Sequence, residues 1–116
     1  MNFSPVLEIY ADPMMRNVFM IILEYALKKD RGVSRLRISV TMSGRTLILI
    51  CEDNGAGIPA NEKEIIFMHG NSKYSDTRLF LVREILGITG LPIRECGDPE
   101  KGVRFEISFP EGRYRT

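Results

Sequence analysis

The sequence has little of what metal sites, disulfide frameworks and membrane spans are built from. His69 is the one histidine among 116 residues, which excludes a site made of several histidines. Cys51 and Cys96 are the two cysteines, and without Cys-x-x-Cys spacing they favour buried thiols over a disulfide framework or a zinc site. No apolar run approaches the ~20 residues of a membrane helix, and the first residues lack a signal-peptide pattern. We therefore expect a cytoplasmic chain that makes no membrane contact.

The charges of the chain nearly cancel. Lys and Arg total 16 against 15 for Asp and Glu, so no net field attracts nucleic acid. With 44% hydrophobic residues, a chain of 116 residues can bury one core but is too short for two ordinary domains. We expect a single domain over residues 1–116 that does not bind nucleic acid.

The hydrophobic pattern predicts strands that alternate with helices. Apolar residues recur at helical spacing in two segments, and they alternate or run together in five others. The expected helices cover residues 14–29 and 79–88, and the expected strands cover residues 6–11, 35–42, 46–51, 91–96 and 103–109. The strand over 46–51 should be more buried than its hairpin partner, and the tail after Pro110 should be frayed. This order favours an α+β two-layer sandwich, in which helices cover one face of a mixed, mainly antiparallel sheet.

A polar segment over residues 61–78 separates the hairpin from the second helix. It contains one apolar cluster, at residues 65–68, so we expect a mobile loop with a brief helix. The N-cap of the second helix is expected among Ser75, Asp76 and Thr77. His69 lies in this loop, where a solvated side chain is the expected role rather than a catalytic one.

The segment ILICEDNGAGIP, residues 48–59, ends an apolar strand in a turn that suits ligand binding. The carboxylate of Asp53 can accept a hydrogen bond from an amino group. Gly55 and Gly57 can let the main chain approach closely and adopt positive φ. The alternative interpretation is an ordinary strand followed by an Asn-Gly turn.

Six blocks in this order resemble the ATP-binding catalytic domain of sensor histidine kinases. They are DP at residues 12–13, ILEYALKK at 22–29, EDNGAGIP at 52–59, IIFMHG at 65–70, LFLVREILGITG at 79–90 and GVRFEISFP at 102–110. That family shares the Bergerat ATP-binding fold with gyrase, Hsp90 and MutL. The resemblance implies this fold, with a lid loop at about residues 59–78.

The resemblance also implies an adenine site at the turn. Asp53 would receive the adenine amino group, Gly55 and Gly57 would shape the pocket, and Ile58 would line it. These residues agree with the ligand-binding interpretation of the segment. ATP or ADP is the expected cofactor.

On the phosphate side, the resemblance points to Glu24, Lys28 and Arg78. Glu24 and Lys28 lie one helical turn apart, so a carboxylate and an ammonium would point toward the phosphates, with Glu24 as the candidate catalytic residue. Arg78 would contact the triphosphate through its guanidinium. The alternative for Glu24 and Lys28 is a solvated ion pair worth ~0.3–0.5 kcal/mol. Phe67 would pack against the lid or belong to the core.

Two parts of the family pattern are altered. Ile21 and Tyr25 stand where the pattern has asparagines, and the second asparagine supplies an oxygen ligand to Mg²⁺, which a bulky phenol replaces poorly. The Gly-x-Gly-Leu run that cradles phosphates is replaced by residues 74–79, and no glycine lies between Gly70 and Gly87. We expect weak nucleotide binding without a well-formed Mg²⁺ site and assign no metal ligands.

Two functions are consistent with this pattern. The first is the donor half of phosphoryl transfer in a two-component system, acting on a histidine of a separate dimerisation domain or protein, with a response regulator as a further partner. The altered Mg-ATP site would impair that activity. The second is a pseudokinase-like module that keeps the fold for protein contacts and no longer binds nucleotide.

Overall fold

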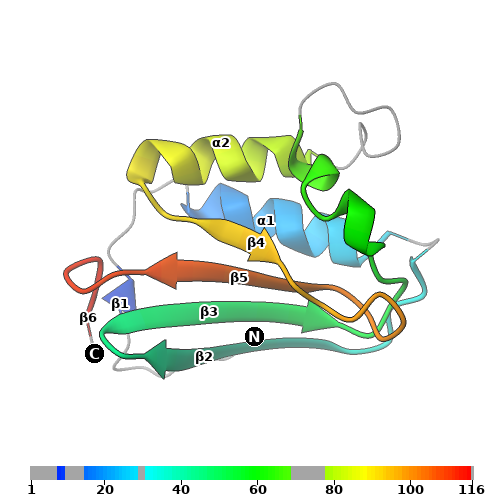
Figure 1. The fold of residues 1–116 in the computed structure, drawn as a ribbon, viewed down its shortest axis with the longest axis horizontal. Helices are drawn as coiled ribbons and strands as arrows, with labels where there is room; N and C mark the ends of the chain where they lie inside the picture. The colour runs from blue at the N-terminus through cyan, green and yellow to red at the C-terminus, as the bar shows by residue number, and fades with distance from the viewer. Residues whose placement is uncertain (1–7, 10–14, 29–30, 69–77, 116) are drawn as a thin grey trace.

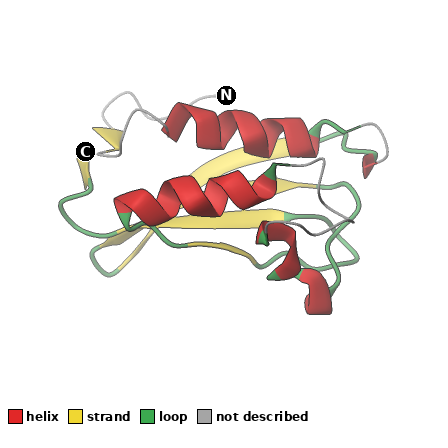
Figure 2. Ribbon diagram, turned by 90° about the horizontal axis from the view of Figure 1, so that it is seen from above, coloured by secondary structure: helices red, strands yellow, loops and turns green. Residues whose placement is uncertain are grey.

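The computed structural model describes residues 8–9, 15–28, 31–68 and 78–115. Its main sheet has four strands in the order β2-β3-β5-β4. Their bounds are β2 Leu36–Ser43, β3 Thr46–Asp53, β4 Ile93–Glu95 and β5 Arg104–Phe109. Helices α1 (Met15–Ala26) and α2 (Leu79–Thr89) lie side by side on one face of this sheet (Figures 1 and 2). The predicted α+β two-layer sandwich is confirmed, although every described strand pair is antiparallel rather than mixed.

The central strands β3 and β5 carry the core because their apolar residues alternate toward the helices. The side chains of these strands that belong to the hydrophobic core cluster are Leu47, Leu49, Cys51, Phe105, Ile107 and Phe109. Charged residues such as Glu52, Arg104 and Glu106 take the intervening positions on the opposite face. The outer strand β2 has no fully buried residue, so the expectation that the second hairpin strand is the more buried one is confirmed.

The helices close the core with one face each. Residues at helical spacing on both helices are buried against the sheet, which is the pattern of an amphipathic helix. They are Val18, Ile21, Ile22 and Tyr25 on α1 and Leu79, Val82, Ile85 and Leu86 on α2. Helix α2 ends at Gly90, whose φ of +74° is the left-handed conformation typical of a helix C-terminus.

A second, two-stranded sheet joins segments near the two ends of the sequence. Strand β1 (Glu8–Ile9) pairs antiparallel with β6 (Tyr114–Arg115). The expectation of a frayed tail after Pro110 is therefore wrong. A turn reverses the chain there, because the amide of Arg113 donates to the carbonyl of Pro110 at 3.0 Å.

The segment after β3 forms two short 3₁₀ helices, η2 (Ala60–Glu62) and η3 (Ile65–Phe67). The brief helix expected at residues 65–68 is present, and Phe67 packs in the core against Phe105, with ring centroids 6.0 Å apart. The expected loop residues 69–77, which include His69, lie outside the described residues. Within the described ranges, no helix has the length and apolar character needed to cross a membrane.

The two cysteines and the start of α2 differ from expectation. Cys51 is buried as predicted, whereas Cys96 is exposed because it follows β4 on the face without helices. The N-cap of α2 is Arg78, with a φ of 58°, rather than Ser75, Asp76 or Thr77. Arg78 makes no side-chain cap hydrogen bond.

Candidate functional site

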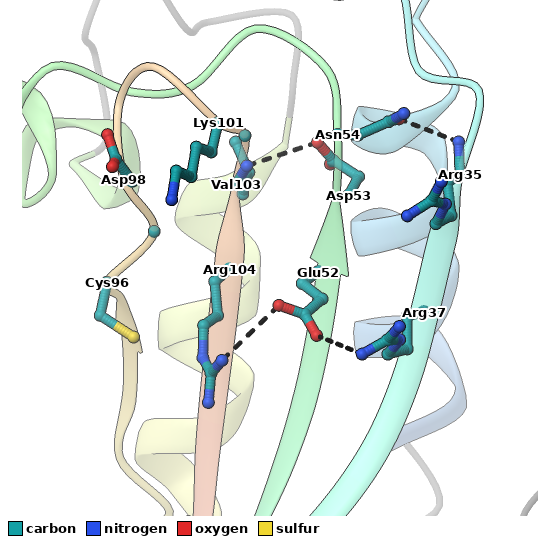
Figure 3. A pocket seen from close by; sticks show the side chains of 12 residues that line it. Arg35, Arg37, Glu52, Asp53, Asn54, Cys96, Asp98, Lys101, Val103 and Arg104 are labelled. Atoms are coloured by element: carbon teal, nitrogen blue, oxygen red, sulfur yellow. Dashed lines mark hydrogen bonds and ion pairs between the residues drawn. The ribbon is translucent and has the colours of Figure 1, made fainter.

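The carboxylate of Asp53 is fixed at the end of β3. Its Oδ1 accepts hydrogen bonds from the amides of Gly55 at 3.0 Å and Val103 at 3.4 Å, and the second of these is drawn in Figure 3. Only 3% of the side chain is exposed. The backbone of Gly102, at φ +145°, packs directly against the Asp53 carbonyl, where a Cβ would collide with it. Asp53 is therefore a buried, oriented acceptor, as its proposed role at the turn requires.

A guanidinium that the sequence analysis did not single out occupies the open side of this carboxylate. Arg31 donates from Nη1 to Oδ2 of Asp53 at 2.7 Å and from Nη2 to Oδ1 at 2.9 Å. Its Nη2 also donates to the carbonyl of Ala56 at 2.5 Å. Its Cζ lies 4.6 Å from the centroid of the Tyr25 ring, and only 5% of the side chain is exposed. The two charges form a bidentate pair that is closed off from solvent.

The loop that carries Arg31 is clamped over the turn. The amide of Ala56 donates to the Arg31 carbonyl at 2.9 Å. The side chain of Asn54 accepts from the amides of Ser34 and Arg35 at 3.0 and 2.9 Å and donates to the Ser34 hydroxyl at 2.8 Å. These bonds hold residues 31–35 against the end of β3, so Arg31 is positioned by backbone and not only by its charge.

The two glycines of the turn are required by close packing. A Cβ at Gly55 would lie 2.5 Å from Cγ2 of Val33 and 2.7 Å from the Arg31 carbonyl oxygen. A Cβ at Gly57 would collide with the backbone of Pro99. The expected close approach is present at both positions, whereas the expected positive φ is wrong, because neither glycine is among the described residues with positive φ.

The sequence comparisons point to sensor kinases. No protein-family model matches the chain. The chain is 33% identical over 122 aligned residues to the adaptive-response sensory kinase SasA of Prochlorococcus marinus, covering 92% of this chain and 32% of SasA. The chain spans a third or less of the length of the curated relatives it matches.

Two solved structures decide the fold. The catalytic domain of histidine kinase ThkA, in a nucleotide-free form, superposes with a TM-score of 0.73 at 21% identity, over 87% of this chain and 70% of that one. The ATP binding domain of PrrB from Mycobacterium tuberculosis superposes with a TM-score of 0.67 at 22% identity, over 84% and 66% of the two chains. The chain has the fold of a histidine kinase catalytic domain. Together with the sequence relatives, these structures confirm the resemblance to histidine kinase catalytic domains.

Tyr25, which the sequence analysis expected at the place of the family's second asparagine, is part of the core. The Tyr25 ring is 6% exposed and packs edge-on against Phe105, with centroids 6.2 Å apart, while Arg31 covers its face. Ile21 and Ile58 are buried in the same core. Ile58 therefore contacts apolar neighbours. At position 25 the one side-chain oxygen is the phenol of Tyr25, which is a poor ligand for Mg²⁺.

Two of the residues expected on the phosphate side, Glu24 and Arg78, are brought together. Arg78 donates from Nη2 to both carboxylate oxygens of Glu24, at 2.7 and 2.6 Å, and both side chains are about half exposed. Helix α1 ends at Ala26, so Lys28 lies two residues beyond it, and its amide donates to the Tyr25 carbonyl at 3.4 Å. Glu24 and Arg78 thus neutralise one another at the edge of the site.

A buried ion pair that sequence reasoning missed anchors the segment between β3 and α2. The ammonium of Lys63 pairs with Oε1 of Glu95 and donates to the carbonyl of Gly97 at 2.8 Å. The other carboxylate oxygen of Glu95 accepts from the amides of Gly97 and Arg104 at 2.8 and 3.0 Å. The Glu95 side chain is fully buried. The pair fixes the short helices η2 and η3 to β4.

A cavity of about 400 Å³ opens on the face of the sheet away from the helices (Figure 3). Its walls include Glu52, which joins Arg37 at 3.8 Å and Arg104 at 3.6 Å. Asp53 both lines this cavity and pairs with Arg31, whereas Ala56 and Tyr25, which also contact the guanidinium, are not among the cavity's lining residues. The cavity is thus a charged hollow separate from the place where Arg31 lies.

The charged groups beside this cavity shift one another's pKa. Burial alone would raise the pKa of Glu106, but hydrogen bonds from Arg94, Cys96 and Arg104 lower it below its usual range. Burial raises the pKa of the Cys96 thiol, and its hydrogen bond to Glu106 contributes further, to about 11.

Burial in the hydrophobic core raises the pKa of the other thiol, Cys51, to about 12. Neither thiol is a ready nucleophile near neutral pH.

Proposed function

We propose that this chain is the ATP-binding catalytic domain of a sensor histidine kinase, spanning residues 1–116, with an impaired Mg-ATP site. The observation that carries the proposal is the buried, amide-anchored carboxylate of Asp53 at the end of β3 in this fold. A fixed acceptor beside glycines is what recognition of an amino group requires. The domain would act as the donor half of phosphoryl transfer.

Each site residue has a role in this proposal. Asp53 accepts a hydrogen bond from the adenine amino group, with Gly55 and Gly57 as close backbone walls and Ile58 beneath the base. Lys28, just after α1, and Arg78, at the end of a lid that covers about residues 59–78, contact the phosphates. Glu24 is the candidate catalytic carboxylate. Because Arg78 is paired with Glu24, a nucleotide must separate them before both act.

The side chains present do not fit a Mg²⁺ site. Mg²⁺ takes hard oxygen ligands in a near-octahedral shell. Position 25 offers a tyrosine packed between Phe105 and Arg31. Among residues 8–9, 15–28, 31–68 and 78–115, no group of three or more His, Cys, Asp or Glu could hold a metal ion. We therefore expect ATP or ADP to bind weakly and without help from the metal, and we derive no step through it.

The partners follow from the division of labour in phosphoryl transfer. Donor, acceptor and charge-neutralising groups must be held in line, so an acceptor histidine on a dimerisation domain is required, in the same protein or on a partner. A response regulator is the further partner that such a system implies.

A second candidate function is a pseudokinase-like module that contacts proteins and no longer binds nucleotide. The ion pair between Arg31 and Asp53 favours it, because the adenine acceptor already has a partner. Tyr25 favours it as well, since restoring an asparagine there would leave a hole in the core.

The test is calorimetric titration of ATP and of ADP, each with and without Mg²⁺, into the purified chain. The controls are Asp53→Ala alone and together with Arg31→Ala, because the double change leaves no buried charge without its partner. Binding that is weak, changes less than twofold with Mg²⁺, and is lost in both controls supports the impaired domain. Binding that strengthens tenfold with Mg²⁺ contradicts the impairment. No binding up to millimolar nucleotide favours the interaction module.

A further inference from the structure

We propose that Arg31 is a built-in plug of the adenine site: its guanidinium holds the place of the base, and adenine enters only when Arg31 leaves. This inference rests on the proposed function, because it takes Asp53 as the adenine acceptor. The plug makes Arg31 the residue that determines whether this domain takes up nucleotide.

The guanidinium imitates how a purine edge would meet this carboxylate. It is planar, and it presents N–H donors to both oxygens of Asp53 at 2.7 and 2.9 Å. Its face lies on the Tyr25 ring with 4.6 Å between Cζ and the ring centroid, where a base could stack. Arg31 thus uses both contacts that an adenine would use here, the hydrogen bond at its edge and the aromatic surface at its face.

Adenine and Arg31 cannot share Asp53. Oδ1 already accepts from Arg31, Gly55 and, at longer range, Val103, and the carboxylate is 3% exposed. Asp53 also borders the cavity on the opposite face of the sheet, but its carboxylate is 3% exposed and its Oδ2 accepts from the Arg31 guanidinium at 2.7 Å, so a base that takes this contact displaces the guanidinium. Binding is therefore an exchange in which the neutral amino group of adenine replaces the charged, bidentate guanidinium of Arg31. The observed Kd equals the Kd of the open site divided by the fraction of molecules in which Arg31 has left Asp53.

The backbone of the loop that carries Arg31 is held in place by hydrogen bonds, so the guanidinium has a fixed position over Asp53. The contacts that hold this loop on the turn include the hydrogen bond from the amide of Ala56 to the Arg31 carbonyl and those from the amides of Ser34 and Arg35 to the Asn54 side chain. The Ala56 carbonyl also accepts directly from the guanidinium at 2.5 Å. Opening the site thus requires the side chain to rotate away while the loop stays in place.

The experiment measures the binding of adenosine and of ADP without Mg²⁺, so that the affinities do not depend on a metal site. Adenosine has no phosphate, so its affinity reports the base and ribose contacts alone. The proteins are the wild-type chain, Arg31→Ala, Arg31→Ala with Asp53→Asn, and Arg83→Ala. The double variant keeps an acceptor oxygen but leaves no buried charge unpaired, which guards against loss of folding. Arg83 is a matched control, since it also lies over an aromatic ring, at 4.4 Å from Phe67, and pairs with an acid, Glu64, at 2.8 Å.

We expect adenosine to bind Arg31→Ala and the double variant at least tenfold more tightly than wild type, and Arg83→Ala to stay within twofold of wild type. In wild type saturated with ADP, the Arg31 Nη NMR signals should move toward those of a solvated guanidinium. Equal adenosine affinity of wild type and folded Arg31 variants, with ADP bound by all, overturns the plug and leaves the nucleotide function standing. Failure of all four proteins to bind either compound overturns both.

Discussion

The buried pair of Lys63 and Glu95 should be one of the most sensitive stability determinants outside the hydrophobic core. Replacing Lys63 by methionine keeps a long unbranched side chain but removes the ammonium. The Glu95 carboxylate, with no exposed surface, then keeps two amide donors and loses its counter-charge. Breaking a buried pair from one side costs ~3–5 kcal/mol. Because two amides remain, we expect the lower end, ~3 kcal/mol.

That loss is large against a typical total stability of ~5–15 kcal/mol. For a domain of this size it corresponds to a fall in Tm of roughly 10–15 °C. Urea unfolding followed by circular dichroism measures it directly. Lys63→Met combined with Glu95→Gln should recover half or more of the loss, because no charge remains buried. Arg45→Met provides the control, since its pair with Glu111 is exposed on both sides and is worth at most ~1 kcal/mol.

Hydrogen exchange gives the local readout. If Lys63 anchors η2 and η3 to β4, amides of residues 60–68 should lose protection in Lys63→Met while those of β3 and β5 follow the global stability. A loss below ~1 kcal/mol, or no rescue by the double change, refutes the reasoning, because the pair would then behave as a surface salt bridge.

Four further predictions follow from the site. Cys96 has a pKa of about 11, so at pH 8 it should react with a thiol reagent roughly a hundredfold more slowly than an ordinary exposed cysteine; Glu106→Gln should speed that reaction severalfold, and an unchanged rate would contradict the hydrogen bond between them. Cys51, with a pKa of about 12 and a buried side chain, should react only when the domain unfolds, as labelling across a urea series can show. The lowered pKa of Glu106 contributes stability above its unfolded pKa that is lost as pH falls through its folded pKa, so Glu106→Gln should flatten the fall in Tm below about pH 5. Gly57→Ala should destabilise by ~1–3 kcal/mol, because its Cβ meets the Pro99 backbone; a change under ~0.5 kcal/mol would show that the loop shifts freely.

The architecture could be predicted because its determinants are local. Alternation along residues 35–42, the apolar run along residues 46–51 and helical spacing along residues 14–29 reflect how each element is buried, and neighbouring residues alone reveal it. The second sheet could not be predicted in this way. β1 lies within the strand expected over residues 6–11, but β6 has only two residues and no periodicity long enough to recognise, and no local pattern indicates that the two pair.

The site shows the same division. The role of Asp53 as a buried acceptor followed from its place after an apolar strand and before two glycines. Its partner Arg31 lies 22 positions earlier, directly before a glycine that ends a helical pattern, and nothing local indicates that its side chain turns back to the strand end. Lys63 and Glu95, 32 positions apart, are a second such pair. Contacts of this kind depend on how the helices and strands pack against one another, and the local hydrophobic pattern of the sequence does not reveal that packing.

The small sheet of β1 and β6 has a mechanical consequence. Its pairs are Glu8 with Arg115 and Ile9 with Tyr114, and the strands run antiparallel, so residues 8 and 115 lie at the same end of this sheet. Tension applied across residues 8 and 115 loads one backbone pair at a time and peels the strands apart, rather than shearing all their hydrogen bonds together. This sheet should therefore open at low force while β2, β3, β5 and β4 remain intact. In a pulling experiment the domain should show a small early extension before the main unfolding event.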